Sequence, residues 1–150
     1  MGYTTDFQGS FTLDRKLDPI THQFLAKLNH TRRMKRDMRG DSKWHQYGID
    51  GEFYVDGGGS HGQDRDDTIL DYNKPPITQP SLWCQWVPST DGREIVWDGA
   101  EKFYEYRAWL AYIISSILAP RHYHLTGNVH YQGEDPDDNG MIIVVENQIL

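Results

Sequence analysis

The stretch from Tyr123 to Tyr131 alternates between two kinds of side chain, and this alternation limits the folds that the chain can adopt. Apolar and aromatic residues, among them Leu125 and Val129, recur at alternate positions, with Gly127 in place of one of them. Because successive side chains of a strand point to opposite faces, this spacing predicts a strand with one face in the core. The other face carries polar side chains suited to water or to a ligand, namely His122, His124, Thr126, Asn128, His130 and Gln132.

The rest of the chain supplies further strands and two helices. Asp18-Pro19 is typical of a helix start, and the apolar spacing continues this helix toward Met38. Asp98 and Glu101 match a capping box and predict a second helix, which ends at Pro120. The expected order is a strand at 7–13, the first helix, a strand at 52–55, a long loop at about 56–80, a hairpin at 82–97, the second helix, and strands at 122–132 and 141–146.

Strands that are joined mainly as hairpins favour an antiparallel arrangement. The sequence therefore predicts an α+β fold, a largely antiparallel sheet of about six strands with two helices packed on one face. A length of 150 residues fits a single domain that spans 1–150 and has its own core.

Charge and composition narrow the possible function classes. The net charge of −7 opposes general nucleic-acid binding, which depends on neutralising phosphates. The single cysteine, Cys84, excludes an internal disulfide and suits a reducing compartment, so we expect a cytoplasmic protein. The chain does not start with a signal-peptide pattern, and its longest apolar run, near Ile113 to Ala119, is too short to cross a bilayer. We therefore expect no membrane partner.

Candidate binding residues come from the strand, the hairpin and the long loop. Trp83 and Gln85 alternate with Leu82 and Cys84, which places them on the opposite face of the expected hairpin. An exposed tryptophan beside a row of imidazoles offers a platform for a ring or a partner surface. Loops as long as 56–80 inside a compact domain are usually functional or disordered. The predicted binding residues are Trp83, Gln85, His122, His124, His130, His61, Asp64, Asp66 and Asp67.

The strand histidines also allow a catalytic interpretation. His124 and Thr126 form one H-x-T element, of the kind that two-histidine phosphoesterases use in pairs as acid and base, and the chain has no second one. His122 and His124 could share a transition metal, with a third ligand from the long loop. The alternative function is therefore a small metal-assisted hydrolase or phosphoesterase, with His122, His124 and Thr126 as candidate catalytic residues. The simpler interpretation is a polar sheet face in contact with water.

A second metal-binding pattern lies near the end of the chain. The segment from Asp135 to Glu146 matches the spacing of a calcium-binding EF-hand loop, with Asp135, Asp137 and Asn139 as candidate ligands. An EF-hand requires a helix on each side, whereas strands are expected before and after this segment. We therefore interpret it as an acidic turn, and predict no metal site and no cofactor.

Several segments of the second half of the chain resemble one group of proteins. These segments are Leu82–Pro88, Trp97–Tyr104, Trp109-Leu110 and Gln132–Asp138. They are similar to small proteins of bacteria and their phages, for which no activity, cofactor or catalytic residue is established. The resemblance implies an accessory protein rather than a metabolic enzyme.

Together these observations favour a non-catalytic binding protein whose partner is another protein, with a homodimer as one form of that partnership. A defence inhibitor or a toxin-immunity protein of a phage or bacterium would fit. An acidic protein of this kind could occupy a basic nucleic-acid site on its target by charge complementarity. The absence of a complete catalytic set in the sequence supports this prediction over the hydrolase alternative.

Overall fold

A six-stranded antiparallel sheet forms the main body of the protein. The computed structural model describes residues 2–150. The strand order is β4-β5-β1-β6-β7-β8, and every neighbouring pair is antiparallel. This confirms the predicted α+β fold. The bounds are β1 Thr5–Leu13, β4 Trp86–Pro88, β5 Glu94–Trp97, β6 Leu125–Gly133, β7 Asn139–Val145 and β8 Gln148–Ile149.

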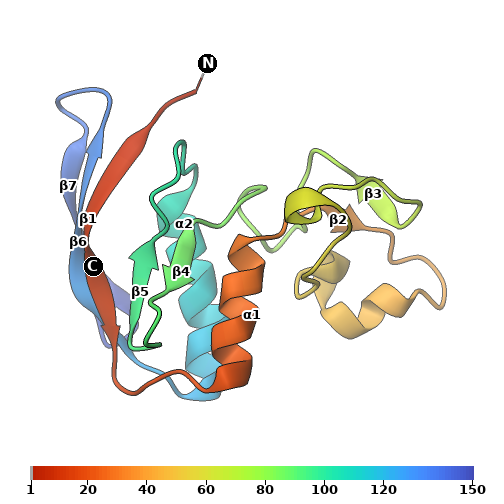
Figure 1. The fold of residues 1–150 in the computed structure, drawn as a ribbon, viewed down its shortest axis with the longest axis horizontal. Helices are drawn as coiled ribbons and strands as arrows, with labels where there is room; N and C mark the ends of the chain where they lie inside the picture. The colour runs from red at the N-terminus through yellow and green to blue at the C-terminus, as the bar shows by residue number, and fades with distance from the viewer. Residues whose placement is uncertain (1) are drawn as a thin grey trace.

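Two helices lie side by side against one face of this sheet (Figure 1). They are α1, Pro19–Asn29, and α2, Tyr106–Ile113, which continues through a π-helical turn at Ile114–Leu118 and a 3-10 turn at Ala119–Arg121. The core forms where the helices meet the sheet, because the inward side chains of the strands are apolar. Its fully buried members include Phe11, Ile95, Trp109, Ile113, Leu125 and Val129.

The pairing of β1 with β6 runs from Thr5 opposite Gly133 to Leu13 opposite Leu125, so the alternating stretch is a central strand. Gly127 interrupts the apolar pattern because the backbone of β1 passes close to it. A Cβ atom at Gly127 would lie 2.6 Å from the carbonyl oxygen of Ser10, which is closer than packed atoms approach. Glycine is therefore required at this position for the two strands to pair.

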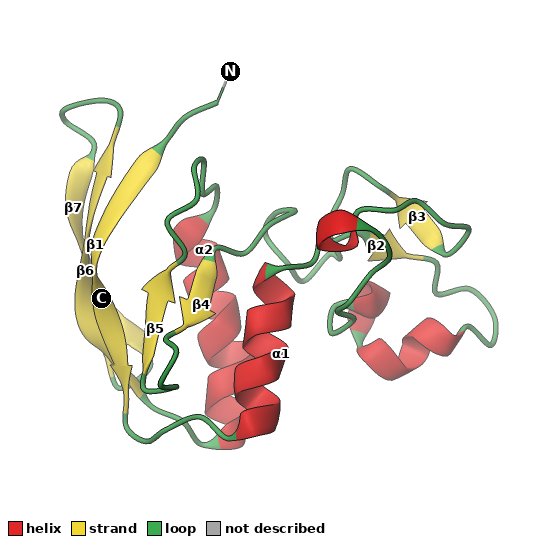
Figure 2. Cartoon of the chain, viewed as in Figure 1, coloured by secondary structure: helices red, strands yellow, loops and turns green. Residues whose placement is uncertain are grey.

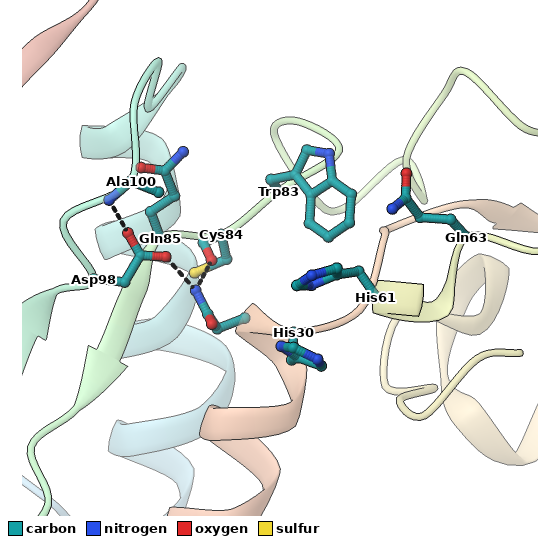
Figure 3. A pocket seen from close by; sticks show the side chains of 9 residues that line it. His30, His61, Gln63, Trp83, Cys84, Gln85, Asp98 and Ala100 are labelled. Carbon is teal, nitrogen blue, oxygen red and sulfur yellow. Dashed lines mark hydrogen bonds between the residues drawn. The ribbon is translucent and has the colours of Figure 1, made fainter. Parts of the chain in front are cut away.

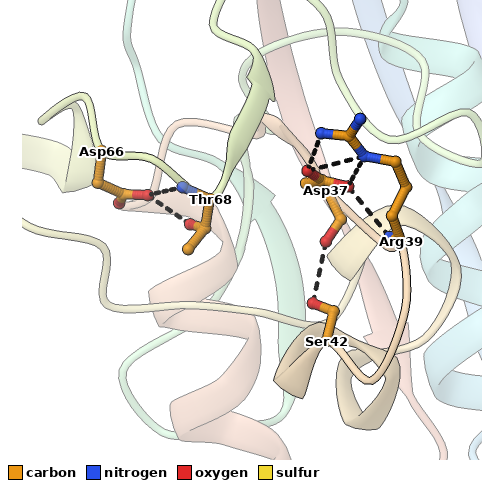
Figure 4. A network of polar contacts seen from close by, with 5 residues as sticks. All are labelled: Asp37, Arg39, Ser42, Asp66 and Thr68. Carbon is orange, nitrogen blue, oxygen red and sulfur yellow. Dashed lines mark hydrogen bonds and ion pairs between the residues drawn. The ribbon is translucent and has the colours of Figure 1, made fainter.

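A side lobe, residues 31–82, leaves the main body after α1 and returns before β4 (Figure 2). It contains β2, Lys35–Arg36, paired with β3, Ile69–Asp71, and 3-10 turns at Lys43–Tyr47, Ile49–Gly51 and Ser60–Gly62. The buried guanidinium of Arg36 lies over the rings of Trp44 and Tyr54, at 4.6 and 5.0 Å from their centroids. Polar contacts within the lobe, such as those of Asp37 with Arg39 and of Asp66 with Thr68, are shown in Figure 4.

The side lobe is joined to α2 by a buried polar network. The hydroxyl of Tyr112 donates to a carboxylate oxygen of Glu52 at 2.7 Å, and Gln79 donates to the Glu52 carbonyl at the same distance. Arg33 also donates to that carbonyl, at 2.9 Å. Desolvation of the Arg33 guanidinium lowers its pKa to about 10. These contacts fix the orientation of the lobe on the main body.

Two expectations about the helices are wrong. The first helix ends at Asn29, because the backbone of the next residue, His30, leaves the helical conformation with a φ of −86° and a ψ of 3°. The basic run that follows, from Thr31 to Arg39, is extended and pairs with the returning chain, from Arg33 N to Leu82 O and from Lys35 N to Lys74 O. The second helix begins at Tyr106 rather than after Asp98, because Lys102 and Glu105 have positive φ angles of 59° and 60°, which no α-helix contains.

Expectations about the middle of the chain also need correction. Residues 52–55 form no strand: 52–53 are a turn, in which Phe53 N bonds to Tyr47 O, and 54–55 are irregular. The first arm of the hairpin begins at Trp86 rather than at 82. The segment 56–80, expected as one long loop, contains a 3-10 turn and the strand β3. No helix within residues 2–150 is long and apolar enough to cross a membrane.

Candidate functional site

Two adjoining cavities meet at Trp83, where the side lobe joins the main body; we call them together the Trp83 cleft. Both are lined by Trp83 and Gln85. The first cavity, of about 290 Å³, is also lined by Asn29, His30, His61, Gln63, Cys84, Asp98 and Ala100 (Figure 3). The second, of about 440 Å³, is also lined by Asn73, Pro75, Ser81, Leu82, Glu101, Lys102 and Tyr104.

Three aromatic rings from separate elements form one wall of the first cavity. The imidazoles of His30, at the end of α1, and His61, in the side lobe, have ring centroids 4.2 Å apart. The His61 ring meets the Trp83 indole edge to face, with centroids 6.1 Å apart and planes at 82°. The wall therefore joins the two parts of the molecule through ring contacts, one tilted and one edge to face.

Asp98 places a carboxylate on the opposite side of the first cavity (Figure 3). One of its oxygens accepts a hydrogen bond from the backbone N–H of Ala100, and the other accepts from the side chain of Asn29, each at 2.8 Å. Among residues 2–150 no Lys or Arg side chain lies within ion-pair distance of Asp98. The carboxylate is thus held in position without a cationic partner.

The floor of the cleft is structural rather than reactive. Gln85 donates to the carbonyl of Glu101 and accepts from the Trp97 indole, so both ends of its amide are engaged. Cys84 is buried, and desolvation raises the pKa of its thiol to about 12. A thiol with such a pKa is not a nucleophile near neutral pH.

The predicted binding residues are divided between two faces of the molecule. Trp83, Gln85 and His61 come together in the Trp83 cleft. The strand histidines lie elsewhere: His130 is on the face of β6 turned away from the helices, opposite Met141, and His124 precedes β6. The expected single surface that combines Trp83 with the strand histidines therefore does not form.

His122 and His124 also lack the arrangement that the catalytic alternative requires. His122 follows a 3-10 turn with a φ of 65°, so the two imidazoles are not neighbours on a strand. The hydroxyl oxygen of Thr126 accepts from the N–H of Glu146. The long loop lies in the side lobe, on the far side of the helices from β6 (Figure 1). The expected contact between loop carboxylates and strand histidines is therefore absent from the described residues.

The acidic residues of the long loop serve the side lobe itself. Asp66 pairs with the buried Arg36 at 3.2 Å and accepts from the N–H of Thr68. Asp64 closes a turn, through a bond from its N–H to the carbonyl of Gly58. Asp67 lines a separate shallow depression with Arg39 and Lys43. These carboxylates do not line the Trp83 cleft.

The acidic turn between β6 and β7 is closed by its own side chains. Asp135 accepts from the N–H of Asp137, and Asn139 donates to the carbonyl of Pro136. Strand β7 follows directly, as expected from the sequence, so no EF-hand forms. Within residues 2–150 no three His, Cys, Asp or Glu side chains gather as a metal site would require.

Among the cleft residues that sequence reasoning missed are Asn29, His30 and Asp98. Asn29 and His30 were interpreted as part of a longer helix, and Asp98 as a helix cap. One signal for Asp98 was available in the sequence. An Asp side chain that accepts from the backbone N–H two residues later is typical of a turn as well as of a helix cap.

The chain was compared with models of protein families, with curated proteins and with solved structures, and none of them matches it. The resemblance to small bacterial and phage proteins therefore stays a prediction from the sequence.

Proposed function

We propose that this protein is a non-catalytic binding protein that recognises another protein through the Trp83 cleft. The observation that carries this proposal is the position of Trp83, whose partly exposed indole separates two adjoining cavities at the junction of side lobe and main body. Tryptophan is enriched at the energetic centres of protein interfaces. An accessory role in a phage or bacterium, as a defence inhibitor or immunity protein in the cytoplasm, is the biological setting that we propose.

The chemistry of the cleft supports binding rather than catalysis. A nucleophile needs a base within hydrogen-bond reach, and the one thiol in the cleft is buried with a raised pKa. Gln85 and Asp98 are engaged in hydrogen bonds to neighbouring groups that hold the walls in place. Such preorganised walls favour recognition, because little conformational entropy is lost on binding.

The proposal is tested by comparing capture by matched variants. Immobilised wild-type protein, Trp83→Ala and Leu70→Ala are exposed to the same bacterial lysate; Leu70 is an exposed residue of β3 outside the cleft. We expect a protein that is retained by the wild type and by Leu70→Ala and is lost from Trp83→Ala. Equal retention by all three proteins would place the binding surface elsewhere.

The hydrolase alternative has a separate test. Hydrolysis of bis-(p-nitrophenyl) phosphate is measured with added Zn²⁺ or Mn²⁺ for the wild type and for His124→Ala. We expect equal background rates from both proteins. A metal-dependent rate that is lost in the variant would favour the phosphoesterase interpretation and contradict the proposal.

A second copy of the chain is a further proposed partner, at the outer face of the sheet. Met141, Ile143 and Val145 project from β7 on the side opposite the helices, and each is at least 36% exposed. Strands β6 and β7 contain no Asp, Glu, Lys or Arg. On a chain of net charge −7, two copies that meet at these two uncharged strands avoid bringing like charges together.

A further inference from the structure

We infer that the Trp83 cleft binds an arginine side chain of a basic protein partner, with the guanidinium stacked on the Trp83 indole and paired with Asp98. The inference rests on the proposed function and names the chemistry that the cleft recognises. Three features of the cleft carry it: an unpaired carboxylate, a planar aromatic surface and an apolar path for the side-chain stem.

The carboxylate of Asp98 is prepared to receive a cation. An ionised carboxylate has about four acceptor positions, and the hydrogen bonds from Ala100 and Asn29 use one on each oxygen. Both oxygens therefore keep a free lone pair, which matches the two parallel donors of a guanidinium. The nearby Glu101 already has a cation, because Lys102 Nζ lies 3.0 Å from its carboxylate. Asp98 is consequently the charged acceptor that a ligand meets.

The indole of Trp83 favours a planar cation over a compact one. Guanidinium groups stack on aromatic faces, and tryptophan is the most favourable ring for this contact. In residues 2–150 no Lys or Arg of the chain lies over Trp83, whereas Arg36, Arg32 and Arg15 each lie over an aromatic ring elsewhere. Several other rings of the protein thus carry one of its own arginines, whereas the only described ring against the Trp83 indole is that of His61.

The second cavity accommodates the approach of the partner. Leu82, Pro75 and Tyr104 line it beside Trp83, and together they offer apolar contact to the methylene groups of an arginine stem. In the first cavity, Gln63 donates through Nε2 to Ser60 O, which leaves its Oε1 as a further acceptor for guanidinium N–H groups. The net charge of −7 attracts a basic partner and speeds its association.

A phosphate-bearing ligand fits this site less well. The carboxylate of Asp98 faces the first cavity and would repel a phosphate. The single lysine that lines the cleft, Lys102, is paired with Glu101. The charged side chains that line the cleft therefore favour a cationic ligand over a phosphate.

The test uses three capped peptides that differ in one side chain: acetyl-Gly-Arg-Gly-amide and its lysine and citrulline analogues. Citrulline keeps the planar shape of arginine and removes the charge. Binding is followed by NMR through the indole N–H signal of Trp83, which is identified by its loss in Trp83→Phe. We expect the arginine peptide to shift this signal and to bind at least about tenfold more tightly than the citrulline peptide, as one charge-assisted pair implies.

Two variants locate the charge that the peptide meets. Asp98→Asn should weaken the arginine peptide by at least about tenfold, whereas Asp137→Asn, which removes a carboxylate from the β6–β7 turn, should leave it unchanged. The indole signals of Trp86, Trp97 and Trp109 report whether Asp98→Asn keeps its fold. If that variant unfolds, the comparison of the arginine and citrulline peptides on the wild type still shows whether the site recognises the positive charge.

Three results would overturn the inference: no shift with the arginine peptide, equal binding of arginine and citrulline, or tighter binding of lysine. None of them overturns the proposed function, which is decided by retention of a whole partner protein in the Trp83→Ala comparison. Conversely, the arginine peptide could bind while no protein is retained in a Trp83-dependent way. That result would support the arginine site and contradict the proposed function.

Discussion

Asp18 joins the start of α1 to the start of β6. Its carboxylate accepts from the N–H and the hydroxyl of Thr21 at 2.8 and 2.9 Å and from the hydroxyl of Tyr123 at 2.8 Å. The Thr21 N–H, the Tyr123 hydroxyl and the Thr21 hydroxyl stabilise the charged form and lower the Asp18 pKa to about 2. One residue thus caps a helix and fixes its position relative to the sheet.

This contact makes the free energy of unfolding depend on pH. The unfolded chain, where the Asp18 pKa is about 3.9, binds a proton before the folded protein does. The stabilisation is therefore complete above about pH 4 and is lost as the pH falls toward 2. Asp18→Asn keeps an acceptor for the Thr21 N–H but removes the charge and the oxygen that accepts from the Tyr123 hydroxyl. It should therefore cost about 1 kcal/mol at pH 7, as one lost hydrogen bond does, and should flatten the decline between pH 4 and pH 2. Urea unfolding at several pH values measures both effects, and Asp6→Asn on β1 is the control. An unchanged slope in Asp18→Asn would contradict the assignment.

Cys84 provides a second prediction for a single residue. Burial raises the pKa of its thiol to about 12, so the thiolate fraction at pH 8 is about a thousandfold below that of a free cysteine. We expect a thiol reagent such as DTNB to label the native protein very slowly and the urea-unfolded protein at the normal rate. Rapid labelling of the native protein would show that the floor of the Trp83 cleft opens in solution.

At the scale of elements, the sequence predicted best where one face of a strand is buried. The alternation around Leu125 and Val129 identified β6, because a strand with one face in the core and the other toward solvent shows its period directly. The basic run was misassigned because Arg33 and Arg36 are buried, one against Glu52 and Gln79 and the other against aromatic rings. Those partners are distant in sequence, and a local pattern does not reveal them.

The candidate site could be predicted only in part for the same reason. Trp83, Gln85 and His61 were identified as binding residues from exposure and loop length, and they do line one cleft. The strand histidines were grouped with them because nothing in the sequence shows that two helices separate the strand from the side lobe. Asp98 was missed because its turn has the same local composition as a helix cap.

The junction between α2 and the side lobe depends on Tyr112. Its hydroxyl donates to Glu52 and accepts from Gln79, and both partners are buried. Tyr112→Phe leaves the Glu52 carboxylate without one donor, which should cost about 1 to 3 kcal/mol. We expect faster amide hydrogen exchange in residues 31–82 and unchanged exchange in β1 and β6. Tyr104→Phe, which removes an exposed hydroxyl, is the control. Equal acceleration throughout the sheet would mean that the lobe and sheet unfold as one unit.

At the scale of the whole molecule, the two proposed interaction surfaces lie on opposite sides. The Trp83 cleft opens where the side lobe meets the main body, and the outer sheet face is turned away from the helices and the lobe (Figure 1). A dimer formed through the sheet would therefore leave both clefts free. Such a dimer would present two binding sites and could engage a partner with two basic segments more tightly than one copy could.

The apolar row on β7 predicts association that depends on the protein concentration and on the absence of charged residues in β6 and β7. Sheets pack face to face when their facing side chains are apolar, and Ile143 lies near the middle of the exposed row on β7. Ile143→Glu places a carboxylate there, so two copies would each desolvate a charge on meeting and should no longer associate. Ile77→Glu makes the same substitution at an exposed site of the side lobe and should leave the association unchanged. Sedimentation velocity over a range of protein concentrations distinguishes these outcomes: a wild type that stays monomeric at every concentration, or a dimer that both variants retain, would exclude this face as the contact between copies.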